Sequence, residues 1–124
     1  MFKVKSLFDA VELDDGLRLW VEPVGLTKDL TEWCEVHHSP PGLAPEAKLV
    51  AWFGRHPDGY DFFRGRYHEA LRAGPYMPAL RDLAVLGQKE AITLLHQGEN
   101  PNENTAAALH EFLSELQAYV EDEG

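Results

Sequence analysis

The sequence predicts an α/β fold: a small mixed β-sheet of three or four strands, packed with four to five helices, in a single domain over residues 1–124. Three observations support this prediction. Two short segments near the N-terminus alternate apolar and polar residues, as strands do. Apolar residues at helical spacing follow from about residue 27 to residue 86. A nearly continuous apolar segment, 91–96, then precedes a last amphipathic helix, so strands and helices are expected to share one core.

Two strands are expected first, over residues 2–8 and 17–22, with a turn at Asp14-Asp15-Gly16 between them. The connection of residues 9–16 is too short for a crossover helix, because parallel crossovers usually take roughly a dozen residues or more. We therefore expect these strands to pair in antiparallel fashion. Pro23 ends the second strand, and Arg18 is expected on its exposed face.

The first helices follow a loop-rich segment. Thr27 is expected to cap a short helix that carries Cys34 on its apolar stripe, and residues 37–43 are expected to form an irregular loop. Pro45 fits the first position of a second helix, which Gly54 would end in a left-handed conformation.

Three further helices are expected, opening near Pro57, at Pro78 and after Asn104. Between the last two, residues 91–96 predict a central strand that is covered on both faces. The expected inward faces of the three helices are Tyr60, Phe63, Tyr67 and Leu71; then Leu80, Leu83 and Ala84; and finally Leu109, Phe112, Leu113, Leu116 and Val120.

The amino-acid composition indicates which classes of partner and which cellular location to expect. The formal net charge is −10, and residues 90–124 hold eight carboxylates with no lysine or arginine. Such a surface repels phosphate groups, so we expect no nucleic-acid partner and no membrane partner. The single cysteine, Cys34, cannot form an internal disulfide, and the first residues do not resemble a signal peptide. The expected location is therefore the cytoplasm.

Several residues fall in the order and spacing of a known family: Ala44-Pro45, Leu49, Trp52-Phe53-Gly54, Pro57, Phe63-Arg64, Tyr67, Thr93-Leu94-Leu95 and Asn104. Through them the chain resembles, over nearly its whole length, the YeaO-like bacterial family, domain of unknown function 488. The Trp-Phe-Gly segment with the upstream Ala-Pro is the specific part. The resemblance implies the α/β fold and carries no activity.

This chain departs from the family pattern, and we expect a divergent member. Family members usually continue the second strand with Val-Asp-Arg and Trp-Pro-Arg-Gly, whereas this chain has the shorter stretch 21–25 without those arginines. His96 stands where the family usually has tyrosine, and residues 37–43 form an insertion. If the missing arginines serve the family's function, the resemblance implies that this member has lost or rebuilt that site.

Arg64 is the sharpest site candidate, because it lies one helical turn from both Tyr60 and Tyr67 at the edge of an apolar face. A guanidinium there needs an anion, either an internal partner such as Glu22 or a ligand. Ligands in α/β proteins gather beyond the carboxyl ends of strands, where Glu22 and His96 are both expected.

The expected ligand-binding set is therefore Arg64, Glu22, His96, Tyr67 and Asn104. His96 is interpreted either as a proton shuttle or as a histidine that closes a strand end. Asn104 is interpreted either as an anion-binding residue at a helix start or as a simple N-cap. No motif for metal, dinucleotide, P-loop or serine-hydrolase chemistry occurs, so no metal and no cofactor are expected.

Two functional hypotheses remain open at this point. In the first, the protein binds a small anionic ligand through Arg64, with Glu22 and His96 as partners in one concave site. In the second, it is a non-catalytic interaction module with a degenerate family site. That module would use its acidic last helix or the region around Tyr76-Met77 to meet a protein partner or a second copy in a homodimer. Whether the protein is an enzyme is left undecided.

Overall fold

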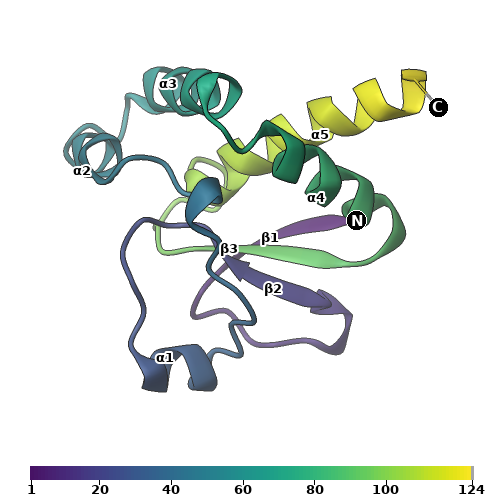
Figure 1. Ribbon diagram of the computed structural model, residues 1–124. Coiled ribbons are helices and arrows are strands. Elements are labelled where there is room, and N and C mark those ends of the chain that lie inside the picture. The colour runs from purple at the N-terminus through teal and green to yellow at the C-terminus, as the bar shows by residue number, and fades with distance from the viewer. Residues whose placement is uncertain (124) are drawn as a thin grey trace.

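Three parallel strands form an open sheet in the computed structural model, in the spatial order β1-β3-β2 (Figure 1). They are β1 (Phe2–Ser6), β2 (Leu17–Trp20) and β3 (Ile92–His96). The structure describes the backbone through Glu123 and side chains through Tyr119. All five residues of β3 are buried, which confirms the predicted central strand.

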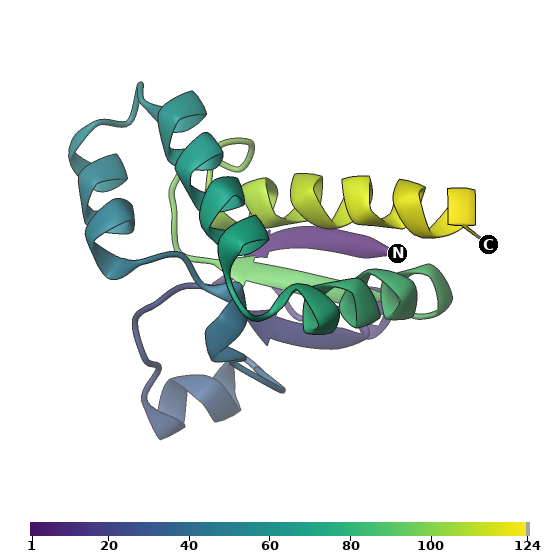
Figure 2. The same ribbon diagram turned by 45° about the horizontal axis from the view of Figure 1, so that its top comes forward.

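Five α-helices complete the predicted α/β class. Their bounds are α1 (Lys28–Trp33), α2 (Ala47–Arg55), α3 (Tyr60–Ala73), α4 (Met77–Lys89) and α5 (Thr105–Glu123). Short 3₁₀ turns occupy Leu13–Asp15 and Pro41–Leu43. Helices α4 and α5 run along one face of the sheet, whereas α1 lies beyond the other face (Figures 1 and 2).

The expected antiparallel pairing of the first two strands is wrong, and the sheet is wholly parallel rather than mixed. Strand β3 lies between β1 and β2 and pairs with both, so the two N-terminal strands never touch. The physical reason is reach: the ten residues 7–16 can extend over roughly 33 Å. A five-residue strand spans only about 17 Å. An extended connection therefore returns along the sheet without a helix.

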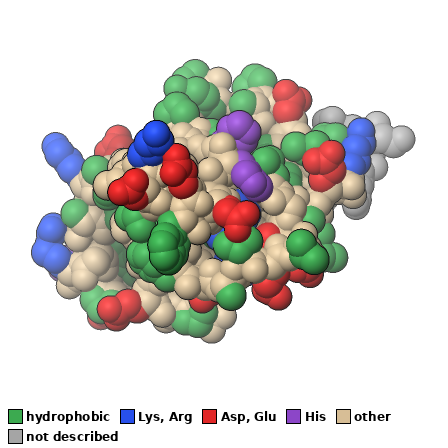
Figure 3. All heavy atoms as spheres, turned by 90° about the horizontal axis from the view of Figure 1, so that it is seen from below, with side chains coloured by type: hydrophobic (Ala, Val, Ile, Leu, Met, Phe, Trp, Pro, Cys, Tyr) green, Lys and Arg blue, Asp and Glu red, His purple; other side chains and the backbone are tan. Residues whose placement is uncertain are grey.

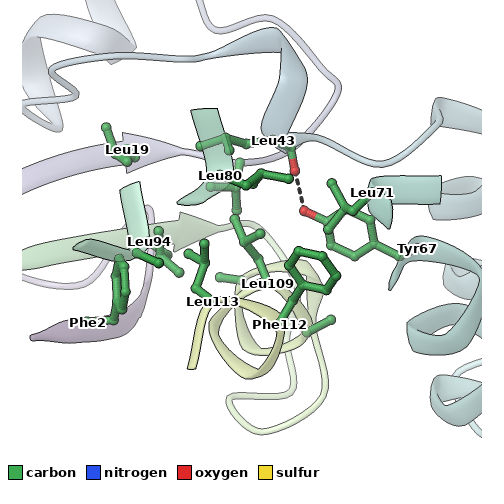
Figure 4. Packing of buried hydrophobic residues seen from close by; sticks show 14 of the residues in the cluster. Phe2, Leu19, Leu43, Tyr67, Leu71, Leu80, Leu94, Leu109, Phe112 and Leu113 are labelled. Carbon is green, nitrogen blue, oxygen red and sulfur yellow. Dashed lines mark hydrogen bonds between the residues drawn. The ribbon is translucent and has the colours of Figure 1, made fainter. Parts of the chain in front are cut away.

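Alternation along the central strand divides the core between the two faces. Leu94 points into the larger cluster, where it packs with side chains from the helices (Figure 4). The buried members labelled there are Phe2, Leu19, Leu43, Tyr67, Leu71, Leu80, Leu94, Leu109, Phe112 and Leu113. The inward faces predicted for α3, α4 and α5 fall in this cluster or pack against it, while the predicted inward position of Val120 lies outside the described side chains.

Leu95 points to the opposite face, where the second and smaller cluster forms. Its other buried members are Leu7, Trp20, Cys34 and Val36. The N-terminal connection and the α1 segment supply most of these residues. They cover the sheet face that the long helices leave free, and they bury Cys34 as a free thiol.

The predictions made from local sequence patterns at the helix ends and in the loop of residues 37–43 are confirmed only in part. Thr27 caps α1 as predicted, since its Oγ1 accepts a hydrogen bond from the N–H of Leu30 at 3.1 Å. Gly54 does not end α2, because the helix continues to Arg55. Residues 37–43 are not irregular throughout: His38 forms a parallel bridge with Leu19, which covers the outer edge of β2.

Arg18 is not on an exposed face, contrary to expectation. It is 1% exposed, and its Nη1 donates to Asp15 Oδ2 at 2.5 Å. Its Nε and Nη2 donate to the carbonyl of Cys34 at 3.2 and 3.0 Å. Both faces of this short strand are covered, so alternation alone could not tell which side meets solvent.

Candidate ligand-binding site

The carboxyl ends of β2 and β3 bring two segments together at one edge of the sheet. Glu22 lies two residues beyond β2, and residues 97–104 link β3 to the start of α5. Because all strands are parallel, these ends must meet at the same edge, where ligands of α/β proteins usually bind.

Glu22 is buried at this edge, with 7% of its surface exposed. Its Oε2 accepts a hydrogen bond from the N–H of Gln97 at 3.2 Å. Its Oε1 has no hydrogen-bond partner among the described residues. Burial raises the pKa of the Glu22 carboxyl, although the nearby Thr105 hydroxyl and the hydrogen bond from the Gln97 N–H act in the opposite direction.

Asn104 is the N-cap of α5, as one of the two interpretations predicted. Its Oδ1 accepts from the N–H of Ala107 at 2.8 Å, and its Nδ2 donates to the carbonyl of Asn100 at 2.9 Å. Thr105, the first residue of α5, lies beside the Glu22 carboxyl. The protein thus places its own anion at the helix start, where the macrodipole favours negative charge.

Glu22 lines two cavities of about 490 Å³ each, one with Trp20 and residues 23–26 and one with residues 97–100. The second is also lined by Thr105 at the start of α5 and is within the size range of ligand sites. We call it the Glu22 cavity. Its wall consists of Glu22 after β2; Val50, Phe53 and Gly54 of α2; Pro57; Gln97, Gly98, Glu99, Asn100, Glu103 and Asn104 of the link between β3 and α5; and Thr105, the first residue of α5. Three of these residues are glutamates and none is a lysine or arginine.

His96, at the end of β3, is 2% exposed, and its Nδ1 also has no hydrogen-bond partner among the described residues. Burial lowers the pKa of His96, and the charge of Asp9 and the backbone of Gly98 oppose that shift only in part. The ring lines a separate cavity of about 450 Å³ with residues of β1 and of the 97–101 segment. Both unpartnered buried atoms of the described side chains therefore lie at this edge.

Tyr67 of α3 uses its hydroxyl inside the protein. It is 1% exposed, and its OH donates a hydrogen bond to the carbonyl of Leu43 (Figure 4). Burial, with a smaller contribution from the charge of Glu22, raises the pKa of Tyr67 well above its usual value. Its visible role is to tie α3 to the Pro41–Leu43 turn.

Arg64 lines none of the cavities that Glu22 and His96 line. Its guanidinium is 3.4 Å from Asp61 and 3.5 Å from Glu111, and it sits 5.9 Å above the ring of Tyr60. The expected internal partner, Glu22, is not the one it contacts. Its side chain is 36% exposed rather than forced into an apolar site, so Arg64 as a ligand anchor stays a prediction from the sequence.

Sequence reasoning missed a buried cluster of charges under the sheet. Asp15 is 1% exposed and accepts from Arg18, from Lys5 at 2.9 Å and from Lys3 at 3.0 Å. Burial opposes ionisation, but the hydrogen bonds from Lys5, the Glu12 backbone and Lys3 hold the pKa of Asp15 well below its usual range.

The same cluster includes three carboxylates that could hold a metal ion by their spacing. Oxygens of Glu12, Asp14 and Asp15 lie within 4.8 Å of one another. Each of these carboxylates is already paired with Lys3 or Lys5 at 2.9 to 3.1 Å. The ammonium groups of Lys3 and Lys5 explain why the three carboxylates lie close together, so we propose no metal site there.

Comparisons with known proteins assign the whole chain to a family. The profile of the inactive DUF488-N3 subclade matches residues 1–124. The chain belongs to the DUF488 family. Uncharacterised proteins of Mycobacterium bovis and Mycobacterium tuberculosis are each 27% identical over 118 residues, which cover 90% of this chain and 92% of theirs. No solved structure matches.

The family assignment confirms the resemblance seen in the motifs around Trp52-Phe53-Gly54. It adds no activity, since these mycobacterial relatives are themselves uncharacterised. Within the part of the chain that is described, no helix has both the length and the apolarity needed to cross a bilayer.

Proposed function

We propose that this protein is a non-catalytic binding protein that holds a small ligand in the Glu22 cavity. The observation that carries the proposal is the Oε1 atom of Glu22: a buried carboxylate oxygen without a partner, on a residue that lines a cavity of ligand size. An unpaired buried acceptor costs free energy, so its retention favours a partner that arrives from outside the chain.

The absence of a catalytic role rests on the subclade and on the chemistry of the cavity. The matching subclade is described as inactive. The wall of the cavity holds no cysteine, serine, histidine or lysine, and its one hydroxyl belongs to Thr105 at the helix start. Carboxylates and amides at this spacing can orient a ligand, which is the role we assign to them.

The competing proposal of a protein-interaction module has weaker support in the described residues. Tyr76 is 47% exposed, and a Cβ on Gly42 would lie 2.5 Å from its ring, so the ring packs against the chain. The most exposed apolar side chains are those of Met1, Phe8, Leu13, Trp33 and Tyr119. Phe8 and Leu13 share the connection between β1 and β2, and the other three lie in different segments. In the view from below, hydrophobic side chains are scattered among acidic ones (Figure 3). A homodimer would need a more continuous patch.

A cavity-filling substitution tests the proposed function. Gly54 lines the cavity, lies within helix α2, and a Cβ there would meet nothing within 4 Å. Gly54→Phe should fill the site while leaving the core intact. Gly65→Phe is the matched control, because Gly65 lies in α3, has equally open space and does not line the cavity.

The measurement is thermal unfolding with a panel of small amines, alcohols, amides, carboxylates and phosphates. At about ten times its Kd a ligand stabilises the fold by about 1.4 kcal/mol, which raises Tm by about 5 °C. We expect at least one compound to raise the Tm of the wild type and of Gly65→Phe. The same compound should leave the Tm of Gly54→Phe unchanged. If no compound of any class stabilises the wild type, or if Gly54→Phe responds equally, the proposed function is wrong.

A further inference from the structure

We propose that the ligand of the Glu22 cavity carries a protonated amine, which donates a hydrogen bond to Oε1 of Glu22. This inference rests on the proposed function and names the chemical class of its ligand. It replaces the anionic ligand expected from Arg64 by a cationic one.

The charge of the wall favours a cation. Glu22, Glu99 and Glu103 all line the cavity, and no lysine or arginine does. Glu103 Oε1 accepts one bond from the Asn100 side chain at 3.3 Å, which leaves its charge uncompensated by any cation of the wall. An anionic ligand would meet three like charges at close range, whereas an ammonium group would be attracted by all of them.

The start of α5 would normally argue for an anion, because helix N-termini bind phosphate and carboxylate groups. Here that position is already filled. The Glu22 carboxyl lies beside Thr105 and accepts from the Gln97 N–H, and Asn104 caps the helix. A ligand anion would have to displace a side chain that is nine-tenths buried. A ligand cation instead completes the charge pair that Glu22 lacks.

A neutral donor would satisfy the hydrogen bond of Oε1 but not the charge of the carboxylate. Removing a carboxylate from water is costly, and the cost is offset best by a positive partner in direct contact. The charge-assisted bond between an ammonium and a carboxylate is also about twice as strong as a neutral one. A primary amine is therefore the donor that this atom fits.

The apolar part of the cavity wall fits a short apolar body. Val50, Phe53 and Pro57 line it, and the ring of Phe53 is stacked on Phe63 at 4.7 Å between centroids. That stacking packs the apolar part of the wall against the core, so a small alkyl or aryl group can pack on it in turn. The expected ligand is thus a small amine with an apolar end.

The test uses three probes of equal length: butylamine, 1-butanol and butyrate. Each is titrated at pH 7 into ¹⁵N-labelled protein, and the backbone amides of Gln97, Gly98 and Thr105 are followed by NMR. We expect saturable shifts with butylamine and at least tenfold weaker effects with the two other probes. The shifts should be absent in Gly54→Phe.

Glu22→Gln keeps the shape of the side chain and one acceptor oxygen, replaces the other oxygen by an NH₂ donor, and removes the charge. It should weaken butylamine binding at least tenfold, while Glu32→Gln on exposed α1, which removes the same charge elsewhere, should not. If butanol or butyrate binds in the cavity as well as butylamine does, the cavity binds ligands but the amine assignment is wrong. If none of the probes perturbs these amides, and no compound of the wider panel stabilises the wild type, both the amine assignment and the proposed function are wrong.

Discussion

At the residue scale, two buried charges of this chain are handled in opposite ways. The guanidinium of Arg18 has its ionic partner, Asp15, and the carbonyl of Cys34 inside the protein. The carboxylate of Glu22 has one backbone donor, a nearby hydroxyl and no cation. The first arrangement is a structural ion pair that stabilises the folded chain, and the second is an incomplete site.

Substitution of Asp15 tests the structural pair. Asp15→Ala leaves a 1%-exposed guanidinium without its carboxylate, so we expect a loss of about 3–5 kcal/mol in the free energy of unfolding. Chemical denaturation measures this loss. Asp14→Ala is the control, because the Asp14 side chain is 76% exposed and contacts only the partly exposed Lys3, and it should change little. Equal losses in the two variants would contradict the assignment.

The same residue predicts an acid dependence. The folded-state pKa of Asp15 is lowered, so the stability that it contributes is present above its unfolded pKa of about 3.9 and is lost as pH falls toward the folded value. Wild type should therefore lose stability below about pH 4 more steeply than Asp15→Asn. Denaturation midpoints measured between pH 5 and pH 2.5 check this, and parallel curves would refute it.

Glu22 predicts a shift of opposite sign. Its folded-state pKa is raised, so the carboxylate costs stability once pH rises above its unfolded pKa, and the cost is complete above the folded pKa. Glu22→Gln should then be more stable than ligand-free wild type at pH 7, with a difference that shrinks toward pH 4. A variant that is less stable at pH 7 would show that Glu22 already has its partner within the fold.

At the scale of elements, Gly16 fixes the entry into β2. Its φ is +63°, and a Cβ there would lie 2.1 Å from the carbonyl oxygen of Ala91. Gly16→Ala should cost about 2 kcal/mol or more, because it adds a steric clash to an unfavourable backbone conformation. Gly25→Ala, with open space around its Cβ, should stay within about 0.5 kcal/mol of wild type in the same unfolding measurement. Equal effects would exclude this explanation.

The elements also show what the sequence could predict. The caps at Thr27 and Asn104 and the buried face of α3 were predicted correctly, because each depends on residues within one or two helical turns. The strand order was not, since it depends on β3 entering between two strands that precede it by more than 70 residues. The burial of Arg18 was missed for a related reason, because the loop and α1 cover a face that no local pattern marks.

The candidate site was predicted in part for similar reasons. Glu22 and His96 were placed at strand ends, and both lie at the same edge, although in different cavities. Arg64 was grouped with Glu22 and His96 because the sequence shows which face of α3 carries it. The sequence does not show how that face is oriented relative to α5. The neighbour that decides its contacts, Glu111, is 47 residues away in the sequence.

At the scale of the whole molecule, the helices do not contribute equally to the core. Neither α1 nor α2 contains a residue that is fully buried, whereas α3 and α4 and the central strand do. Segments with few buried apolar contacts open at lower free energy than the core does. The wall that α2 gives to the Glu22 cavity therefore belongs to the less stable part of the fold.

Hydrogen exchange tests this division. We expect the amides of β3 to exchange only through global unfolding, while those of α1 and α2 exchange through local opening with much weaker protection. Addition of a ligand that fills the cavity should raise the protection of α2 and leave α1 unchanged. Uniform protection across all five helices would contradict the division.

The central claim is that Glu22 presents a buried carboxylate that lacks a cation until a ligand supplies one. The most direct measurement is the pKa of Glu22 itself, from ¹³C NMR of its side-chain carboxyl as a function of pH, without and with saturating butylamine. The account predicts a pKa above the ordinary value of 4.5 in the free protein and a lower one in the complex. A pKa that is ordinary in the free protein and unmoved by the amine would contradict it.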